Sequence, residues 1–517
     1  MSAPARPLVP PLRGADRARP GVGRGVLLAL LLVTAGFLGL FMDATTLVMA
    51  LGLCNIAVVV FLLLKRDITW GFLFYLTTVI FFQTGFWIRL HSFPDLYPGR
   101  VSSILLFLVF LIQIIVGMRK VPPLGVIEKS MVVFVVLMFI SIITTGQRPA
   151  WLLLMRGYIY PFLFFYFARA VVNREDQLKL VFAYLVTVGI YFAVMGIFEK
   201  LKWYALVWPR FIVDATVAEH GLMRLGFRVR GIFLQPAVLG TVMTMGFFPA
   251  WHWLNQRKGI VVMVIRIVLL LTTPATLFFT ETRSVYLGFL FALIIASVWG
   301  RGLRVVSIGI LLAGATGAFL NWDNLGTQDR NKGGLATMNT IQYRVELAYE
   351  TAEIFVDHPF FGVGFQNFDE AAIRYRKPRD VPVIGHVDIG VGGQSISHNI
   401  LETIVAEQGA AGLVPFVLVF VLVILRSLRA YHALPRQGLI SKDYVVCVWC
   451  GIAAYLTNAM FLEMRYFEYV NVLFFFLLGA MVGMQEAVEA DRMQLDVPVE
   501  AAPVSPWAGT VAVGGRA

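Results

Sequence analysis

Charged residues are scarce in this sequence, since Asp, Glu, Lys and Arg make up only 14% of the 517 residues. Soluble globular proteins carry about 25% charged residues. Hydrophobic residues make up 58% of the chain, with glycine not counted among them. The sequence therefore excludes an ordinary soluble protein and predicts one whose apolar surface faces lipid.

Cysteine is almost absent: Cys54, Cys447 and Cys450 are the only three, and all lie in apolar runs. This number and placement exclude a disulfide framework. Cys447 and Cys450 form a CxxC pair, but no second Cys or His pair accompanies it, so the spacing does not indicate a zinc site. We interpret both side chains as small hydrophobic groups packed on one face of a helix.

Long apolar runs dominate the chain instead. A bilayer core of about 30 Å needs roughly 20 apolar residues per helix. Fourteen segments qualify, at 26–42, 44–64, 68–88, 101–118, 130–145, 150–171, 178–198, 231–253, 260–280, 284–300, 303–320, 413–428, 444–462 and 466–484. The predicted fold is thus an all-α, polytopic membrane protein with about fourteen transmembrane helices and twelve as the lower bound.

Basic residues predict the orientation, because Lys and Arg accumulate in cytoplasmic loops. The chain has 43 Lys and Arg against 31 Asp and Glu, a formal net charge of +12. If the Arg-rich N-terminus is cytoplasmic, alternate loops are basic at Lys65/Arg66, Arg119/Lys120/Lys129, Arg174/Lys179, Arg257/Lys258, Arg301/Arg304 and Arg426/Arg429/Arg436/Lys442. Both termini are therefore predicted to be cytoplasmic, and the excess positive charge needs no nucleic acid to explain it.

Two outward segments are longer than simple connections. Segment 199–230 is rich in Lys and Arg on the side where the positive-inside rule makes them rare. Segment 321–412 is long enough to indicate a functional loop, with a helical pattern from Ile341 to Val356. We expect residues 1–25 to be a basic cytoplasmic segment, 26–198 the first transmembrane helices, 199–484 the core with the outer loop 321–412, and 485–517 a disordered cytoplasmic tail.

Three charged groups far apart in sequence are predicted at the outer membrane level: Arg230, Arg283 and His398. An arginine at a membrane interface is a functional candidate unless it snorkels to lipid headgroups, which is the simpler alternative for each one alone. His398 could accept a proton from a hydroxyl near pH 7. It could equally be a structural histidine, and with Glu402 alone at i+4 it does not indicate a metal site.

Four motifs surround these residues. HNILETIVAEQGAAG at 398–412 contains His-Asn, nine residues and then Gly-x-x-Gly; HPFFGVGFQNF lies at 358–368, RSVYL at 283–287 and RGIFLQPAVLG at 230–240. In this order, over roughly 180–480, they resemble the bacterial O-antigen ligase and O-antigen polymerase superfamily. The resemblance implies a GT-C-like glycosyltransferase with a large periplasmic loop, although fourteen spans exceed the twelve typical of the ligases.

The resemblance further implies an inverting transfer of a glycan from undecaprenyl pyrophosphate to an acceptor hydroxyl at the periplasmic face of the inner membrane, without cofactor or metal. The acceptor would be the lipid A core or a growing glycan, and other polysaccharide-assembly proteins could be partners. His398 would be the catalytic residue, as general base or as the group that positions the acceptor. The pyrophosphate would be bound by Arg230, Arg283 and Arg344, and the supporting residues would be Asn399, Glu407, Gly409, Gly412, Gly362 and Gly364.

Several alternatives stay open from the sequence alone. Glu407 and Glu402 could orient His398 or serve packing, and Arg224 or Arg228 could face the site in place of Arg230. Gly362 and Gly364 would shape a turn that closes the outer loop over the site. Ligase and polymerase are poorly separated, and the alternative to an enzyme is a transporter or flippase of polyprenyl-linked glycans.

Overall fold

The structure is a computed structural model that describes residues 55–61, 67–82, 97–146, 150–213, 228–320, 322, 338–381, 385–387 and 398–496. The predicted span 26–42, most of the span 44–64, Cys54 and Arg224 lie outside the described residues. The described part is mostly helical, and seven of its helices are long and apolar enough to cross a membrane. The protein is therefore a polytopic, helical membrane protein.

The helices follow the apolar runs of the sequence. The long ones are α4 (Pro98–Ile115), α5 (Val126–Thr145), α8 (Glu175–Lys200), α10 (Pro236–Asn255), α11 (Ile260–Phe279), α17 (Ile400–Ala433), α18 (Lys442–Ala459) and α19 (Glu468–Asp496). All of these except α10 and α18 are among the seven candidate membrane spans. A further span consists of α6 (Ala150–Leu154), the π-helix η1 (Met155–Ile159) and α7 (Tyr160–Val171). The shorter apolar helices are α3 (Thr69–Phe81), α12 (Arg283–Trp299) and α13 (Arg304–Leu320).

Two helix boundaries differ from the sequence prediction. α17 begins at Ile400 rather than near 413, so the last part of the predicted outer loop 321–412 is helical. α19 continues to Asp496, which removes 485–496 from the predicted disordered tail. The first part of this extension is paired, because Glu486 accepts hydrogen bonds from Arg169 on α7 and Glu489 accepts one from Arg426 on α17. The rest of the predicted tail, from residue 497, lies outside the described part.

α19 packs most closely against α7, because two glycines let the backbones approach. A Cβ atom at Gly479 would lie 2.1 Å from the Phe165 carbonyl oxygen, and one at Gly483 would lie 2.6 Å from that of Arg169. Glycines four residues apart are a common device for close helix contact in membranes, where lipid supplies no hydrophobic force between helices. This pair places the α19 N-terminus beside the π-helix η1.

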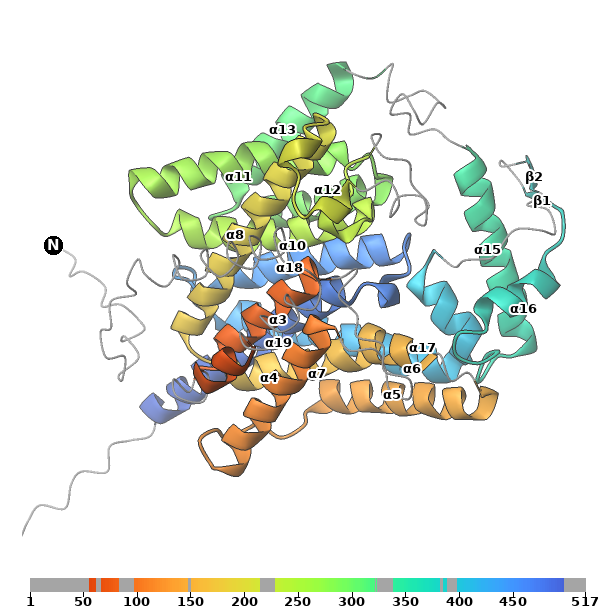
Figure 1. Cartoon of the computed structure of the whole chain (residues 1–517), viewed down its shortest axis with the longest axis horizontal. Helices are drawn as coiled ribbons and strands as arrows, with labels where there is room; N and C mark the ends of the chain where they lie inside the picture. Colours follow the sequence, from red (N-terminus) through yellow and green to blue (C-terminus); the bar gives the residue numbers. More distant parts are fainter. Residues whose placement is uncertain are drawn as a thin grey trace, which may run out of the picture.

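The helix ends gather at two ends of the bundle. At one end, Arg169 bonds to Glu128 at 2.5 Å, and Asp443 accepts the backbone N–H of Arg301 at 2.8 Å and of Gly302 at 2.9 Å. These residues belong to the loop ends that the basic pattern assigns to the cytoplasm. In Figure 1 the C-terminal end of α19 lies at this end, away from α15.

A small polar subdomain stands at the other end of the bundle (Figure 1). It consists of α15 (Met338–Asp357), α16 (Phe368–Tyr375) and an antiparallel hairpin of β1 (Arg379–Val381) and β2 (Gly385–Val387). The helical pattern predicted at Ile341–Val356 is confirmed as part of α15. Its apolar face packs on α16 and on Ala406 of α17. Its acidic face binds two arginines at the start of the hairpin, with Glu350 at 3.0 Å from Arg376 and Glu346 at 3.2 Å from Arg379, the first residue of β1.

Cys447 and Cys450 are buried thiols on α18. The Cys450 thiol donates to the Ala292 carbonyl oxygen of α12 at 3.2 Å. The packing interpretation of the CxxC pair is therefore confirmed, because both side chains fill a helix interface.

Candidate active site

The His-Asn pair begins α17, and the asparagine caps it. The Asn399 side-chain oxygen accepts the Leu401 N–H at 3.0 Å, which satisfies one of the free donors at the helix start. Its amide nitrogen donates to Glu402 at 3.1 Å. Asn399 thus fixes where the helix begins and holds His398 just outside its first turn.

The Gly-x-x-Gly pair of the motif at 398–412 coincides with a break in the same helix. Gly409 has φ 57° and ψ −152°, which is not helical, and α17 resumes after it. This region of backbone space is essentially restricted to glycine. The break opens carbonyl and N–H groups that the helix would otherwise satisfy internally.

The turn from the second motif fills that break. Backbone hydrogen bonds run in both directions between the two motifs: Ala410 N–H to Pro359 O at 2.8 Å, Ala411 N–H to Phe360 O at 2.9 Å, Val363 N–H to Ala406 O at 2.9 Å and Gly364 N–H to Glu407 O at 2.9 Å. The segments 358–364 and 406–411 are separated in sequence but form one backbone-paired unit. We call this unit the interlock.

Glycines are required in the interlock for two reasons. Gly362 and Gly364 have φ of 63° and 97°, in the region that glycine adopts without strain. A Cβ at Gly362 would lie 2.4 Å from the Ala406 oxygen, and one at Gly409 would lie 2.6 Å from the Pro359 oxygen. Gly412 lies against Gln408, and a larger residue would not fit, because a Cβ at position 412 would lie 2.3 Å from the Cβ of Gln408.

Glu407 belongs to a buried ion cluster beneath the interlock. Its two carboxylate oxygens accept from the two terminal nitrogens of Arg465, at 2.5 and 2.9 Å. The Nε of Arg465 contacts Glu463. Arg465 lies in the 3₁₀ turn η6 (Met464–Tyr466) between α18 and α19. Glu407 therefore ties α17 to this turn.

His398 lies in a group with two residues of α15. Its ring centroid is 5.8 Å from that of Tyr343, and Arg344 follows on the same helix. The Arg344 guanidinium stacks over Phe461 at 4.7 Å and donates to the Phe461 oxygen at 3.4 Å. Partial burial, and then the nearby Arg344 charge, lower the pKa of His398 below its ordinary value. The imidazole is therefore neutral at pH 7 and able to accept a proton.

Arg230 and Arg283 lie in a second group, where the end of α8 meets the turn between α11 and α12. Arg230 is buried and donates to the Ile212 oxygen at 2.7 Å, while Glu199 of α8 lies 4.0 Å from its Nε. Glu199 also accepts the N–H of Gly231 at 2.9 Å. Arg230 thus holds the entry into the 3₁₀ turn η4 (Gly231–Phe233), which leads to α10.

Arg283 is the first residue of α12, directly after the turn. Arg228 lies beside it, since its Nε donates to the Thr280 oxygen at 2.9 Å and its terminal nitrogen donates to the Thr282 hydroxyl. Lys200 bonds to Glu281 at 2.6 Å in the same turn. Four basic residues, Lys200, Arg228, Arg230 and Arg283, are thereby concentrated at this end of the bundle. Among the described residues, no three His, Cys, Asp or Glu side chains are placed to hold a metal ion.

Sequence reasoning missed two features of this end of the bundle. Arg465 counted only as a loop charge, although it is one of the most buried ion-pair partners of the site. Arg156 was not singled out, although it interrupts the apolar run 150–171 and lies in the π-helix η1. A charged residue within an apolar run was the signal that could have identified it.

Residues 267–417 match the family model described as O-antigen ligase. This part of the chain is therefore similar to the O-antigen ligase family. The matched range starts within α11 and ends within α17, so Arg283, Arg344, His398 and both segments of the interlock lie within it. Arg230 and Arg465 lie outside it and contribute from the flanking helices. No curated protein matches this chain.

Proposed function

We propose that this protein is an inverting glycosyltransferase that moves a glycan from undecaprenyl pyrophosphate to an acceptor hydroxyl at the periplasmic face of the bacterial inner membrane. The family match supports function of the O-antigen ligase or polymerase type. The observation that supports catalysis is the placement of His398 beside Arg344 within the matched range, with the pKa of the imidazole lowered by burial and by that guanidinium.

In the proposed reaction His398 removes the proton of the acceptor hydroxyl. The freed oxygen attacks the anomeric carbon and forms the new glycosidic bond. The bond from that carbon to the phosphate oxygen breaks, and the electron pair leaves with undecaprenyl pyrophosphate. A positioned base of this kind contributes typically about 10²- to 10⁴-fold in rate. Attack from the face opposite the leaving group inverts the configuration of the anomeric carbon.

The leaving pyrophosphate gains negative charge, which fixed cations stabilise. Arg344 is the donor-binding candidate beside His398, and Arg283 with Arg228 forms the second basic group. Guanidinium groups suit phosphate because their nitrogens form paired hydrogen bonds with its oxygens. Arg230 also belongs to this proposal, although its bonds to Ile212 and its approach to Glu199 support a role in holding the basic segment in place.

The first test replaces the proposed base. His398→Ala should reduce glycan transfer by about 10²-fold or more, measured as the surface-glycan and lipid-linked-glycan profiles of the native cell. The matched control is His386→Ala, because His386 is an exposed histidine of the same subdomain whose side chain pairs with Asp380 at the hairpin. Membrane insertion of both variants is verified by topology labelling.

The profile also identifies the reaction. Polymeric glycan that accumulates on the carrier while the acceptor stays bare means ligation, and accumulated single repeats mean polymerisation. A His398→Ala protein that is inserted and forms full product would overturn the catalytic role and favour transport of polyprenyl-linked glycans.

A further inference from the structure

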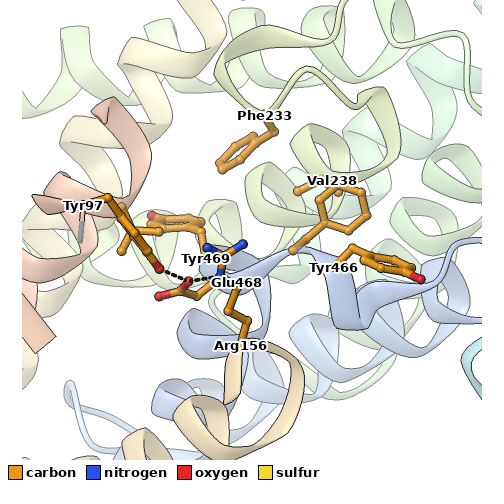
Figure 2. A pocket seen from close by; sticks show the side chains of 9 residues that line it. Tyr97, Arg156, Phe233, Val238, Tyr466, Glu468 and Tyr469 are labelled. Carbon is orange, nitrogen blue, oxygen red and sulfur yellow. Dashed lines mark hydrogen bonds and ion pairs between the residues drawn. The ribbon is translucent and has the colours of Figure 1, made fainter. Parts of the chain in front are cut away.

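A cavity of about 150 Å³ lies among α3, α4, α10, α19 and the π-helix η1. Figure 2 shows its aromatic and charged side chains converging on one space. It is lined by Val79, Tyr97, Arg156, Phe233, Val238, Tyr466, Phe467, Glu468 and Tyr469. Its volume is below the range of roughly 300 to 1,000 Å³ typical of sites for whole drug-sized ligands, so it suits one small group.

The polar part of the cavity is a charge pair held by tyrosines. Arg156 and Glu468 approach to 3.8 Å, and Glu468 accepts hydrogen bonds from Tyr97 at 2.7 Å and Tyr75 at 2.8 Å. The Arg156 guanidinium also lies 5.3 Å from the centre of the Tyr97 ring. The lining therefore combines one positive and one negative group, which leaves it without net charge.

The position of Arg156 is itself informative. It lies in a π-helical turn within a membrane span, and π-helical turns are often found at functional sites. An arginine within a span is costly unless it has a partner or faces water, so its retention indicates use. Tyr466, which also lines the cavity, is 49% exposed.

This chemistry fits a neutral polyhydroxyl ring better than an anion. A phosphate group would meet the Glu468 carboxylate as well as Arg156, whereas a sugar hydroxyl can donate to the first and accept from the second. The rings of Phe233, Tyr466 and Phe467 supply apolar walls for the C–H faces of a sugar. Shape, polarity and net charge thus agree on one ligand class.

Two turns connect the cavity wall to residues of the two groups described above. The turn η4 connects Arg230 to Phe233 in the wall, and η6 connects Arg465, the partner of Glu407, to Tyr466, another lining residue. A glycan held by its pyrophosphate at the basic group would have sugar rings to place nearby.

We propose that this cavity is a sugar subsite that binds one ring of the glycan substrate, an inference that rests on the proposed function. The site recognises hydroxyl groups through Arg156 and Glu468 and stacks the ring against the aromatic wall. It fixes the position of the glycan chain relative to the anomeric carbon that reacts.

The test uses the full-length protein in lipid nanodiscs and two probes. The first probe is glycan released by mild acid from the cell's own lipid-linked pool, which carries no pyrophosphate, and the second is undecaprenyl pyrophosphate without glycan. Saturation-transfer NMR should show binding of the released glycan to the native protein. Arg156→Met should weaken glycan binding about tenfold, since it removes a charged hydrogen-bond donor, and should leave carrier binding unchanged.

Two further variants keep the result decisive. Tyr466→Ala should also weaken glycan binding, and because Tyr466 is 49% exposed, this variant should disturb the core less than loss of a buried ring. Arg266→Met is the matched control, because Arg266 also lies in a span but stacks on Trp251 at 5.0 Å outside the cavity lining. It should bind glycan as the native protein does.

Unchanged glycan binding by both Arg156→Met and Tyr466→Ala would overturn the subsite, as would the absence of saturation transfer to the native protein. Loss of carrier binding alone in Arg156→Met would also overturn it, by showing a phosphate site. His398→Ala separates the two proposals: it should bind the released glycan normally, and if it still transfers glycan, the catalytic proposal fails while the binding result stands.

Discussion

Gly409 lies at the break in α17, and the substitution Gly409→Ala tests whether the interlock depends on that backbone geometry. At φ 57° and ψ −152° an alanine is strained, and such strain costs about 1 to 3 kcal/mol. Its Cβ would also lie 2.6 Å from the Pro359 oxygen and 2.8 Å from the Phe360 oxygen. Because both contacts involve backbone atoms, the turn 358–364 has to move.

That movement breaks the hydrogen bonds from Ala410 to Pro359 and from Ala411 to Phe360. Each contributes about 1 kcal/mol, so the total destabilisation should be about 3 to 5 kcal/mol. The free energy of unfolding should fall by this amount in denaturant titrations of the purified protein. The amides of Ala410 and Ala411 should also lose protection against hydrogen exchange.

Gly314→Ala is the matched control, because Gly314 lies inside α13 and a Cβ there would meet nothing within 4 Å. It should be neutral or stabilising by less than about 1 kcal/mol. If Gly409→Ala matched this control in stability and kept the protection of both amides, the interlock would not depend on a glycine at the break.

Two further predictions concern the charged groups. Arg344→Gln should move the acidic limb of the pH–rate profile to higher pH, because loss of the positive charge makes His398 easier to protonate and raises its pKa. Arg344→Lys keeps the charge and should leave the limb in place. An unshifted profile for Arg344→Gln would contradict the assignment of His398 as the base. Glu407→Gln should lower the free energy of unfolding by about 3 to 5 kcal/mol, because it breaks the buried bidentate pair with Arg465. Glu463→Gln should cost less, since burial raises the pKa of Glu463 to about 8 and its carboxyl is mainly protonated at pH 7; equal losses in the two variants would refute this difference.

The sequence predicted the helices of the membrane core well where apolar runs end at charged residues. The predicted runs 260–280, 284–300 and 303–320 correspond to α11, α12 and α13. The boundaries of α17 and α19 were less accurate. Both helices extend through polar residues that hydropathy assigns to water. Asn399 caps the start of α17, and Glu486 of α19 accepts a hydrogen bond from Arg169.

The candidate site was predicted in its parts but not in its arrangement. The motifs brought attention to His398, Arg344 and the glycines, and the family match covers the range 267–417 that contains them. The arrangement of the basic residues into two groups, with Arg344 beside His398 and Arg283 beside Arg228, depends on how α15 packs on α17 and how α8 meets the α11–α12 turn. Spacing along the chain carries no information about such contacts.

The sequence by itself therefore determined that this protein lies in a membrane, and it determined which reactive side chains are available. The long apolar runs indicate that lipid surrounds the protein. Because lipid offers no hydrogen bonds to the backbone, each run has to satisfy its own backbone groups by forming a helix. Only the tertiary structure decided what the charges do. Arg465 joins Glu407 across the bundle, and Arg156 meets Glu468 in a cavity, because burial forces each charge to find a partner from another helix.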